Sequence, residues 1–149
     1  MHVRRSGTAL GVAVLTVLTI PTSAQAAGVA CGGGASTGRV SVNGCISAER
    51  QWFGDVPYRE VTAYIKLHNT GPRAVAVSFE AEKSRNGGPW KKVGNSRTTV
   101  GAGQTLGPTA VGSDTEFCDG QKVVVRVHAK AAGGGWSNWS QASTKQCQT

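Results

Sequence analysis

Strict alternation of apolar and polar residues is the main pattern along this chain. Over residues 60–68, Val61, Ala63, Ile65 and Leu67 point to one side, and polar residues separate them. A period of two residues is typical of an antiparallel strand with one buried face. The pattern therefore predicts a half-buried strand over residues 60–68.

The same alternation predicts two further strands, over residues 74–82 and 122–130. Their expected core residues are Val75, Val77, Phe79 and Ala81 in the first strand, and Val123, Val125, Val127 and Ala129 in the second. Turn residues end these segments, namely Asn69-Thr70-Gly71-Pro72, Arg85-Asn86-Gly87-Gly88 and the run 131–135. The chain therefore reads as strands joined by tight turns.

Weaker patterns predict the remaining elements. We expect short strands at 90–93 and 97–100, a returning strand at 136–142, and an irregular edge strand within long loops at 101–119. Asn43-Gly44 is a hairpin signal between strands at 39–42 and 45–52. About seven short strands separated by Gly, Pro and Asn predict an all-β protein with a single antiparallel β-sandwich.

The first 26 residues have the pattern of a signal peptide. Arg4 and Arg5 precede an apolar run over residues 9–20, Pro21 ends that run, and Ala24-Gln25-Ala26 is a small-x-small cleavage site. The run is too short to span a bilayer, and no second run is long enough. We therefore expect a secreted, extracellular product of bacterial type that consists of one domain, residues 27–149.

The composition of that product favours anionic partners without identifying one. Fourteen of the 16 basic residues remain after cleavage and face 8 acidic ones, which gives a net charge of about +6. Such a charge attracts anionic cell-wall polymers or polysaccharide, and it also keeps a protein soluble. Because the basic residues are dispersed and form no run of five or six, the sequence gives no support for nucleic-acid binding.

The four cysteines predict two structural disulfides, because the count is even and the chain is expected in an oxidising compartment. If the turn at 131–135 centres the last hairpin, Cys118 lies opposite Cys147 and Arg126 lies opposite Trp139. A one-residue shift at Asp119-Gly120 would change this register. Cys31 and Cys45 then pair by elimination and attach the N-terminus to the first hairpin.

The sequence offers no convincing metal, cofactor or catalytic site. The cysteines lack the close spacing of a zinc site, and no phosphate-loop or hydrolase motif occurs. His68 and His128 fall on expected solvent faces without an acidic neighbour in sequence, and Glu80 and Glu82 share an open face. The acidic residues Asp114, Glu116 and Asp119 do not have calcium-loop spacing, which favours a solvated acidic loop. We expect a protein that is not an enzyme and needs no cofactor.

The segment Trp136-Ser137-Asn138-Trp139-Ser140 is the most specific motif. Together with the strand 123–130, it resembles the WSXWS box of fibronectin type III domains, which are immunoglobulin-like β-sandwiches. Trp52 followed by Pro57 is a fainter similarity to the second strand of that fold. The resemblance covers about twenty residues and implies a sandwich, but we do not extend cytokine binding to this chain.

In that family the box is a structural ladder of tryptophan rings stacked between cations of the neighbouring strand. The resemblance implies the same role here for Trp136 and Trp139 with Arg126 and Lys130, since Arg126, His128 and Lys130 share one strand face. Odd spacing would turn one tryptophan towards the core, unless a bulge places both outside. The alternative is a platform on which exposed tryptophans stack against sugar rings.

Two hypotheses of function follow. The first is a non-catalytic extracellular module that binds cell wall or a polysaccharide surface, with Trp52, Trp90 and Tyr64 as candidate binding residues. The second is a secreted inhibitor of an extracellular hydrolase, whose candidate loops are residues 53–59, 84–89 and 101–114.

Overall fold

The computed structural model describes residues 28–148, which form eight β-strands and no helix. The strands are β1 (Ala30–Thr37), β2 (Val40–Phe53), β3 (Val56–Asn69), β4 (Val75–Arg85), β5 (Lys91–Val100), β6 (Thr105–Phe117), β7 (Val123–Ala131) and β8 (Ser140–Thr144). The predicted signal peptide, residues 1–26, lies outside the described residues. Within residues 28–148 there is no helix that could cross a membrane.

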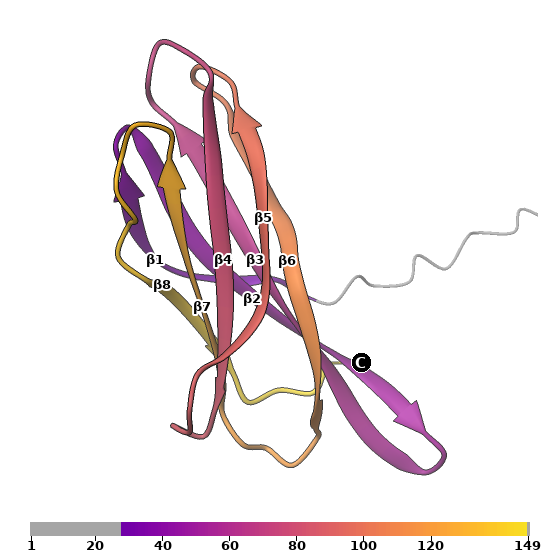
Figure 1. Ribbon diagram of the computed structural model, residues 1–149. Coiled ribbons are helices and arrows are strands. Elements are labelled where there is room, and N and C mark those ends of the chain that lie inside the picture. Colours follow the sequence, from indigo (N-terminus) through magenta and orange to yellow (C-terminus); the bar gives the residue numbers. More distant parts are fainter. Residues whose placement is uncertain (1–27, 149) are drawn as a thin grey trace, which may run out of the picture.

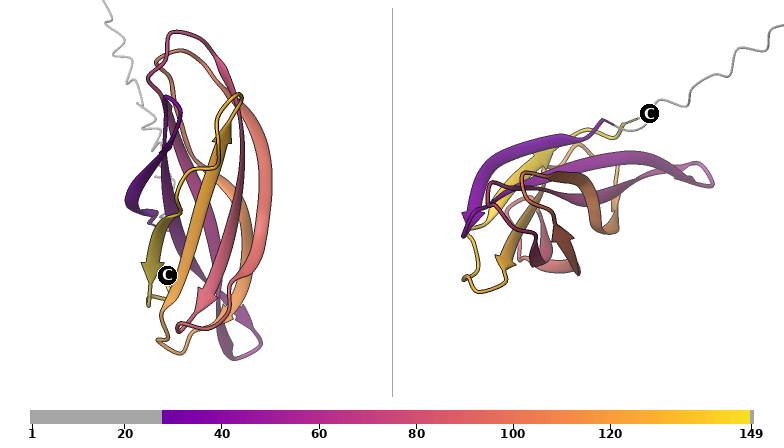
Figure 2. Two further views of the ribbon diagram at one scale, coloured as in Figure 1. Left: turned by 60° about the vertical axis from the view of Figure 1, so that its left-hand side comes forward. Right: turned by 90° about the horizontal axis from the view of Figure 1, so that it is seen from above.

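The strands form two four-stranded sheets that pack face to face (Figures 1 and 2). One sheet has the order β1-β2-β3-β6 and the other β5-β4-β7-β8, and every neighbouring pair is antiparallel. The predicted all-β sandwich is confirmed, with eight strands where the sequence indicated about seven.

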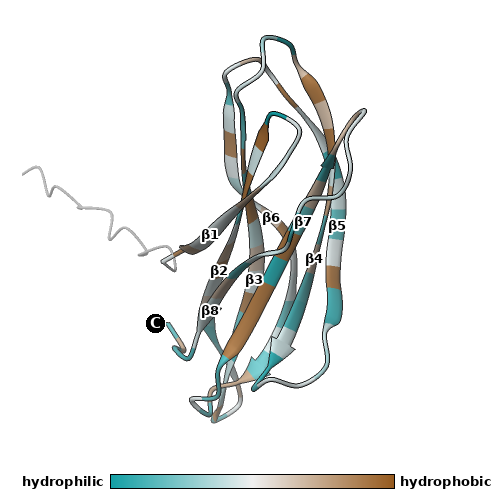
Figure 3. Ribbon diagram, turned by 90° about the vertical axis from the view of Figure 1, so that its left-hand side faces the viewer, coloured by the Kyte–Doolittle hydropathy of each residue, from teal (hydrophilic) through white to brown (hydrophobic). Residues whose placement is uncertain are grey.

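The core lies between the sheets and follows the predicted alternation. Val61, Ala63, Ile65 and Leu67 of β3 are all buried, as are the expected residues of β7 and all those of β4 except Val75, which is half-buried. Figure 3 shows the result as alternating hydrophobic and hydrophilic bands along these strands. Small branched side chains therefore form a continuous apolar layer, as in other aligned sandwiches.

The predicted turn at Asn43-Gly44 is wrong, because both residues lie within the continuous strand β2. The turns that do bound this strand contain Gly38 (φ 54°) and Gly54 (φ 58°). Gly44 serves another purpose: a Cβ atom there would lie 2.5 Å from the carbonyl oxygen of Ser140 in β8. The glycine therefore allows two backbones to approach each other.

Two strands around a turn are predicted at 90–93 and 97–100, but residues 91–100 form the single strand β5, and Trp90 precedes it. Gly94, within that predicted turn, packs against β6, where Gly112 lies opposite. A Cβ on Gly94 would be 2.1 Å from the Val111 oxygen, and one on Gly112 would be 2.1 Å from the Val93 oxygen. The edge strands of the two sheets therefore touch through glycine backbone. The predicted irregular edge strand within 101–119 is β6, and register shifts interrupt its pairing with β3.

The last hairpin differs from the predicted register by two residues. β8 begins at Ser140 rather than at residue 136, and Arg126 pairs with Gln141 instead of Trp139. Trp136 makes only an isolated bridge to Lys130. The connection between β7 and β8 is therefore longer than the glycine run 131–135 suggested.

Substitution of Gly94 by alanine is expected to lower the free energy of unfolding by about 1–3 kcal/mol, the usual effect of overpacking. The new methyl group would overlap the Val111 carbonyl, which is held by the backbone of β6. Urea titration would measure the change. Gly33→Ala is the matched control, since a Cβ there meets no atom within 4 Å. Equal stability of the two variants would contradict the close approach of β5 and β6.

Candidate functional site

A stack of five side chains covers the outer face of the β5-β4-β7-β8 sheet. The Arg126 guanidinium carbon lies 4.0 Å from the centroid of the Trp90 ring and 4.3 Å from that of Trp139. The His128 ring continues the stack, 3.6 Å from Trp139 and 4.3 Å from Trp136 between centroids. The order is therefore Trp90, Arg126, Trp139, His128, Trp136, in which rings alternate with basic groups.

Two carboxylates of β4 hold the basic members of this stack in place. Glu82 accepts hydrogen bonds from Arg126 Nε (2.8 Å) and Nη2 (2.6 Å), and Glu80 Oε1 lies 2.7 Å from His128 Nε2. Each pair lies directly opposite in the β4–β7 register. The expectation that His128 lacks an orienting acid was therefore wrong, because the partner comes from a neighbouring strand and not from nearby sequence. The hydrogen bond from His128, followed by that from Lys92, lowers the pKa of Glu80 below its usual 4.5.

The serines of the tryptophan motif attach it to both sheets. Ser137 exchanges hydrogen bonds with Ala129 of β7, since its N–H donates to the Ala129 oxygen and its Oγ accepts from the Ala129 N–H. Ser140 Oγ accepts from the Gly44 N–H at 2.7 Å and donates to the Gly33 oxygen. Both tryptophans consequently lie on the outer face. The expectation that odd spacing turns one inward fails because residues 137–139 are not a regular strand.

The composition of the stack differs from the predicted ladder at two positions. Lys130 is exposed, and among the described residues its ammonium group stacks on no aromatic ring. Trp90, which the sequence offered as a candidate binding residue and not as a member of the ladder, covers the other face of Arg126. The sequence did not indicate that Trp90 belongs to the stack, because this residue precedes β5 and meets Arg126 only through the tertiary fold.

A second aromatic cluster lies at the free end of the β2–β3 hairpin, which projects beyond the sandwich (Figure 1). Its side chains include three of the most exposed large apolar groups of residues 28–148, Trp52, Phe53 and Phe117. The exposed fractions are 64% for Trp52, 80% for Phe53, 46% for Val56 and 50% for Phe117, which follows at the end of β6. We call these four residues the hairpin tip.

The pairing of β2 with β3 places apolar groups on both faces of the hairpin. Trp52 pairs with Pro57 on one face, and Phe53 pairs with Val56 on the other. Tyr58 shares the second face and packs on Phe117, with 4.9 Å between ring centroids. Exposed apolar surface of this kind, concentrated at a projecting end, is typical of an interaction site.

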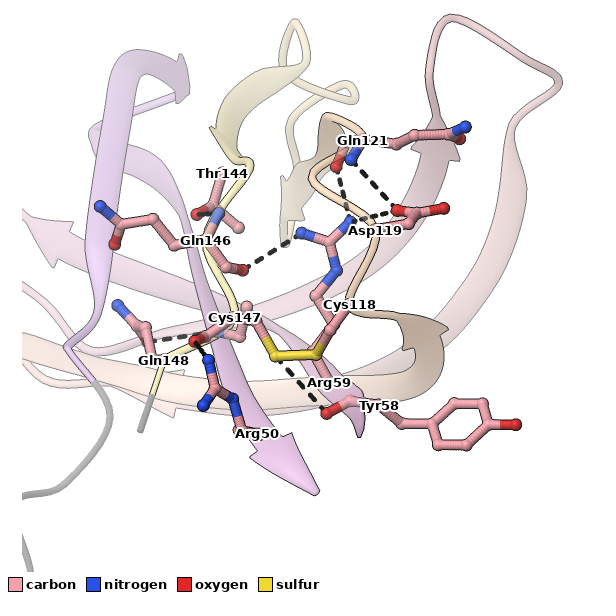
Figure 4. The surroundings of a disulfide bond; sticks show 11 residues. Arg50, Tyr58, Arg59, Cys118, Asp119, Gln121, Thr144, Gln146, Cys147 and Gln148 are labelled. Carbon is pink, nitrogen blue, oxygen red and sulfur yellow. Dashed lines mark hydrogen bonds and ion pairs between the residues drawn. A yellow bond between two sulfur atoms is a disulfide. The ribbon is translucent and has the colours of Figure 1, made fainter. Parts of the chain in front are cut away.

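The base of the hairpin is fastened by the C-terminal segment (Figure 4). Cys147 is bonded to Cys118, and its carbonyl accepts a hydrogen bond from Arg50 Nη2 at 3.3 Å. Gln148 bridges the β2 backbone, because its N–H donates to Ala48 and its oxygen accepts from Arg50. The tip therefore extends from a fixed base.

The structure contains both predicted disulfides, Cys31–Cys45 and Cys118–Cys147. The first joins directly opposed residues of β1 and β2. The second joins segments that flank β7 and β8, so the reason given for it, an opposed pair within the last hairpin, does not hold. Two disulfides are typical of an oxidising compartment.

Arg59 of β3 is fully buried and lies at the end of the core next to the disulfide Cys118–Cys147 (Figure 4). Its guanidinium donates to the carbonyls of Gln146 (3.1 Å) and Gln121 (2.6 Å) and lies 4.0 Å from Asp119. Burial lowers the pKa of this guanidinium below its usual value. Arg59 therefore ties β3 to the segments on both sides of the second disulfide (Figure 4).

Asp114 and Asp119 are exposed, as the sequence indicated, but the acidic residues near Cys118 are ion-paired, and Asp114 and Glu116 lie in β6 rather than in a loop. Lys83, only 4% exposed, pairs with Asp114 (2.6 Å) and Glu116, and Arg85 pairs with Glu116 and Asp119. The hydrogen bond from Lys83 lowers the pKa of Asp114, and a backbone hydrogen bond from Gln121 lowers that of Asp119. Residues 28–148 contain no group of three His, Cys, Asp or Glu that could hold a metal ion.

The predicted binding residues do not form one surface. Trp52 lies at the hairpin tip, Trp90 lies in the stack, and Tyr64 is half-buried on β3, where its hydroxyl accepts a hydrogen bond from Ser47 at 3.2 Å. His68 is bonded to Thr105 at 2.8 Å. Phe53, Val56 and Phe117 were not singled out as candidate binding residues, although the turn Gly54-Asp55 between two apolar pairs marks an apolar hairpin end.

Fold and bonding define the described chain as a disulfide-linked, two-sheet antiparallel β-sandwich. No known family model matches the chain, and no curated protein matches it in sequence. Among solved structures it is similar to a domain of the Bacteroides uniformis β-glucuronidase, with 13% identity and a TM-score of 0.48 over 66% of this chain. The chain matches only 12% of the length of that enzyme. A protein from Archaeoglobus fulgidus matches 74% of this chain and 98% of its own length, with 17% identity and a TM-score of 0.34.

Replacement of Trp139 by alanine is expected to lower the free energy of unfolding by about 2–3 kcal/mol. The ring is stacked on both faces: its cation–π contact with Arg126 contributes about 0.5–1 kcal/mol, and the stacking on the His128 ring and the buried area add to that. Chemical denaturation would measure the loss. Trp136→Ala is the matched control, because that ring ends the stack and is half exposed; its loss should be clearly smaller. A larger loss for Trp136→Ala would contradict the proposed order of the stack.

The Glu80 carboxylate is expected to make stability depend on pH in the acid range. Because its folded pKa lies below 4.5, its contribution is present above pH 4.5 and disappears as the pH falls through the folded value. Glu80→Gln should therefore cost about 1 kcal/mol at neutral pH, and this cost should shrink as the pH falls below 4.5. Denaturant titrations over the acid range and at neutral pH would measure the difference. Glu49→Gln is the control, because Glu49 is exposed and has no ion pair among the described residues; this variant should keep the wild-type dependence of stability on pH. A loss of stability in Glu80→Gln that does not change with pH would refute this role of Glu80.

Proposed function

We propose that this protein is a secreted, non-catalytic binding module that attaches to an anionic cell-wall polymer or polysaccharide surface through its hairpin tip. The observation that carries the proposal is the exposure of Trp52 and Phe53 at the end of a braced, projecting hairpin. Aromatic rings present flat apolar surface that packs against sugar rings. The net charge of about +6 after signal-peptide cleavage would add attraction to an anionic polymer.

The stacked face is the weaker candidate for the binding surface. Trp139 is covered on one side by Arg126 and on the other by His128, so neither ring face is free for a sugar. Trp90 is covered on one side by Arg126. We therefore assign the stack a structural role, as the resemblance to the WSXWS box of fibronectin type III domains implies, and assign binding to the hairpin tip.

A co-sedimentation assay on insoluble cell-wall and polysaccharide fractions tests the proposal. At low salt the double variant Trp52→Ala/Phe53→Ser should bind about a hundredfold less tightly than wild type, since each of the two rings contributes on the order of 1.5 kcal/mol on burial. Retention of the wild type should also fall as salt is added, because salt screens its attraction to the polymer.

Trp136→Ala is the matched control for this assay, because it removes an exposed tryptophan from the other sheet and should leave retention unchanged. Both variants need to be fully folded at the assay temperature for the comparison to be valid, which their unfolding curves would show. Absence of wild-type retention on every fraction at low salt would contradict the proposal. Equal loss in both variants would show that the hairpin tip is not the binding element.

A second function, inhibition of an extracellular hydrolase, is favoured by the shape of the same element. A convex hairpin with a fixed base fits a concave cleft, and residues 53–59 were already a candidate inhibitory loop. The disulfide Cys118–Cys147 and the Arg59 hydrogen bonds fix that base. Rates of exported proteases and amylases, measured with micromolar protein, would separate the two functions, because only the inhibitor lowers a rate in the absence of polymer.

A further inference from the structure

A cavity of about 330 Å³ lies at the end of the sandwich opposite the hairpin tip. Three turns enclose it, namely those that join β1 to β2, β3 to β4, and β7 to β8. Its volume is at the lower end of the range of small-molecule sites. The cavity shares no residue with the stack or with the hairpin tip.

Hydrogen bonds between the turns fix the shape of this cavity. The buried Asn69 side chain donates to the carbonyl oxygens of Arg73 (2.8 Å) and Val100 (3.1 Å), and it accepts from the Gly71 N–H (2.8 Å). Thr70 binds the Arg39 carbonyl through both its N–H and its hydroxyl. The walls are therefore formed before any ligand arrives, which lowers the entropic cost of binding.

The β7–β8 turn is attached to the same frame from the other side. The Ala132 N–H donates to the Ala76 carbonyl at 2.8 Å, and Thr37 Oγ1 donates to the Gly135 carbonyl at 2.6 Å. All three turns are thus linked to strands of the sandwich.

Charge and polarity of the lining indicate the kind of ligand. Val40, Pro72, Val75 and Ala131 contribute apolar wall. Arg39 and Arg73 are the only charged lining residues; both are exposed, and neither has an acidic partner among residues 28–148. An apolar pocket with two unpaired guanidinium groups suits a small anion that carries an apolar body.

We propose that this cavity binds a small organic carboxylate with a compact apolar body. The apolar part would fill the space between the three turns, and the carboxylate would lie between Arg39 and Arg73. At roughly 30 Å³ per water-sized volume, the cavity holds a molecule of about ten non-hydrogen atoms. The site is independent of the proposed attachment through the hairpin tip.

The probe for this site is 4-phenylbutyrate, and its uncharged amide serves as the matched ligand control. Titration followed by ¹H–¹⁵N spectra should shift the amides of Gly71, Gly133 and Gly134, with a Kd of about 1 mM or tighter at this ligand size. The amide should bind about tenfold more weakly, because it cannot pair with the arginines. Shifts confined to other parts of the protein, or none at ~10 mM ligand, a concentration well above the expected Kd, would overturn the proposal.

Variants separate this site from a general effect of charge. Arg39→Gln/Arg73→Gln should weaken binding of 4-phenylbutyrate about tenfold, whereas Arg97→Gln, an exposed arginine on β5, should not change it. Ala132→Trp should abolish binding by filling the cavity while the unfolding midpoint is retained. Trp52→Ala/Phe53→Ser should bind the probe like wild type, so that failure of the wall-binding proposal and failure of this one are told apart. If both Arg39→Gln/Arg73→Gln and Ala132→Trp bind the probe with unchanged affinity, the site is refuted.

Discussion

The two sheets of this sandwich approach each other so closely at their edges that only glycine fits between the backbones. A Cβ on Gly32 of β1 would lie 1.5 Å from the Gln141 oxygen of β8, and one on Gly94 would lie 2.1 Å from the Val111 oxygen of β6. The first contact closes one side of the sandwich and the second closes the other. Edge strands normally offer unpaired backbone groups to other chains, and mutual contact of the edges covers part of that surface. Close backbone contacts between edge strands therefore hold the two sheets together along both sides of the sandwich.

This constraint also explains what the sequence does and does not predict. Alternation correctly identified the core strands, because burial of one face imposes a period of two wherever the strand runs straight. Glycine is ambiguous, since it serves both turns and close approaches: Asn43-Gly44 has the sequence of a hairpin turn, yet it lies inside β2 because β8 crosses there. For the same reason, the sequence predicted a turn at Gly94 and two short strands where the structure has the single strand β5. Only the partner strand distinguishes the two uses, and the partner is not visible locally.

The charged residues show a second limit of local patterns. Arg59 lies two residues before Val61 and Lys83 two residues after Ala81, so each shares the strand face of a core residue. Alternation alone would therefore place both charges in the core, and both are buried. A charge in that phase normally indicates the end of a strand. Here β6 supplies the opposite charges for Lys83, since Asp114 and Glu116 pair with its ammonium group from the other sheet. Such compensation depends on tertiary contacts, which is why the sequence did not reveal these ion pairs.

The distribution of aromatic side chains then determines which surface remains available for binding. Trp90, Trp136 and Trp139 are committed to the stack with Arg126 and His128, where ring faces are covered by basic groups. A stack of this kind stabilises the outer face of a sheet without a second layer to bury it. The cover at the hairpin tip is looser, since Arg50 lies 6.0 Å from the Trp52 centroid and Arg85 lies 5.9 Å from that of Phe117. The C-terminal segment and the second disulfide fix the base of the hairpin. A rigid support beneath exposed rings lowers the entropic cost of ordering them on a partner, and this gives the tip, rather than the stack, the physical properties of a binding element.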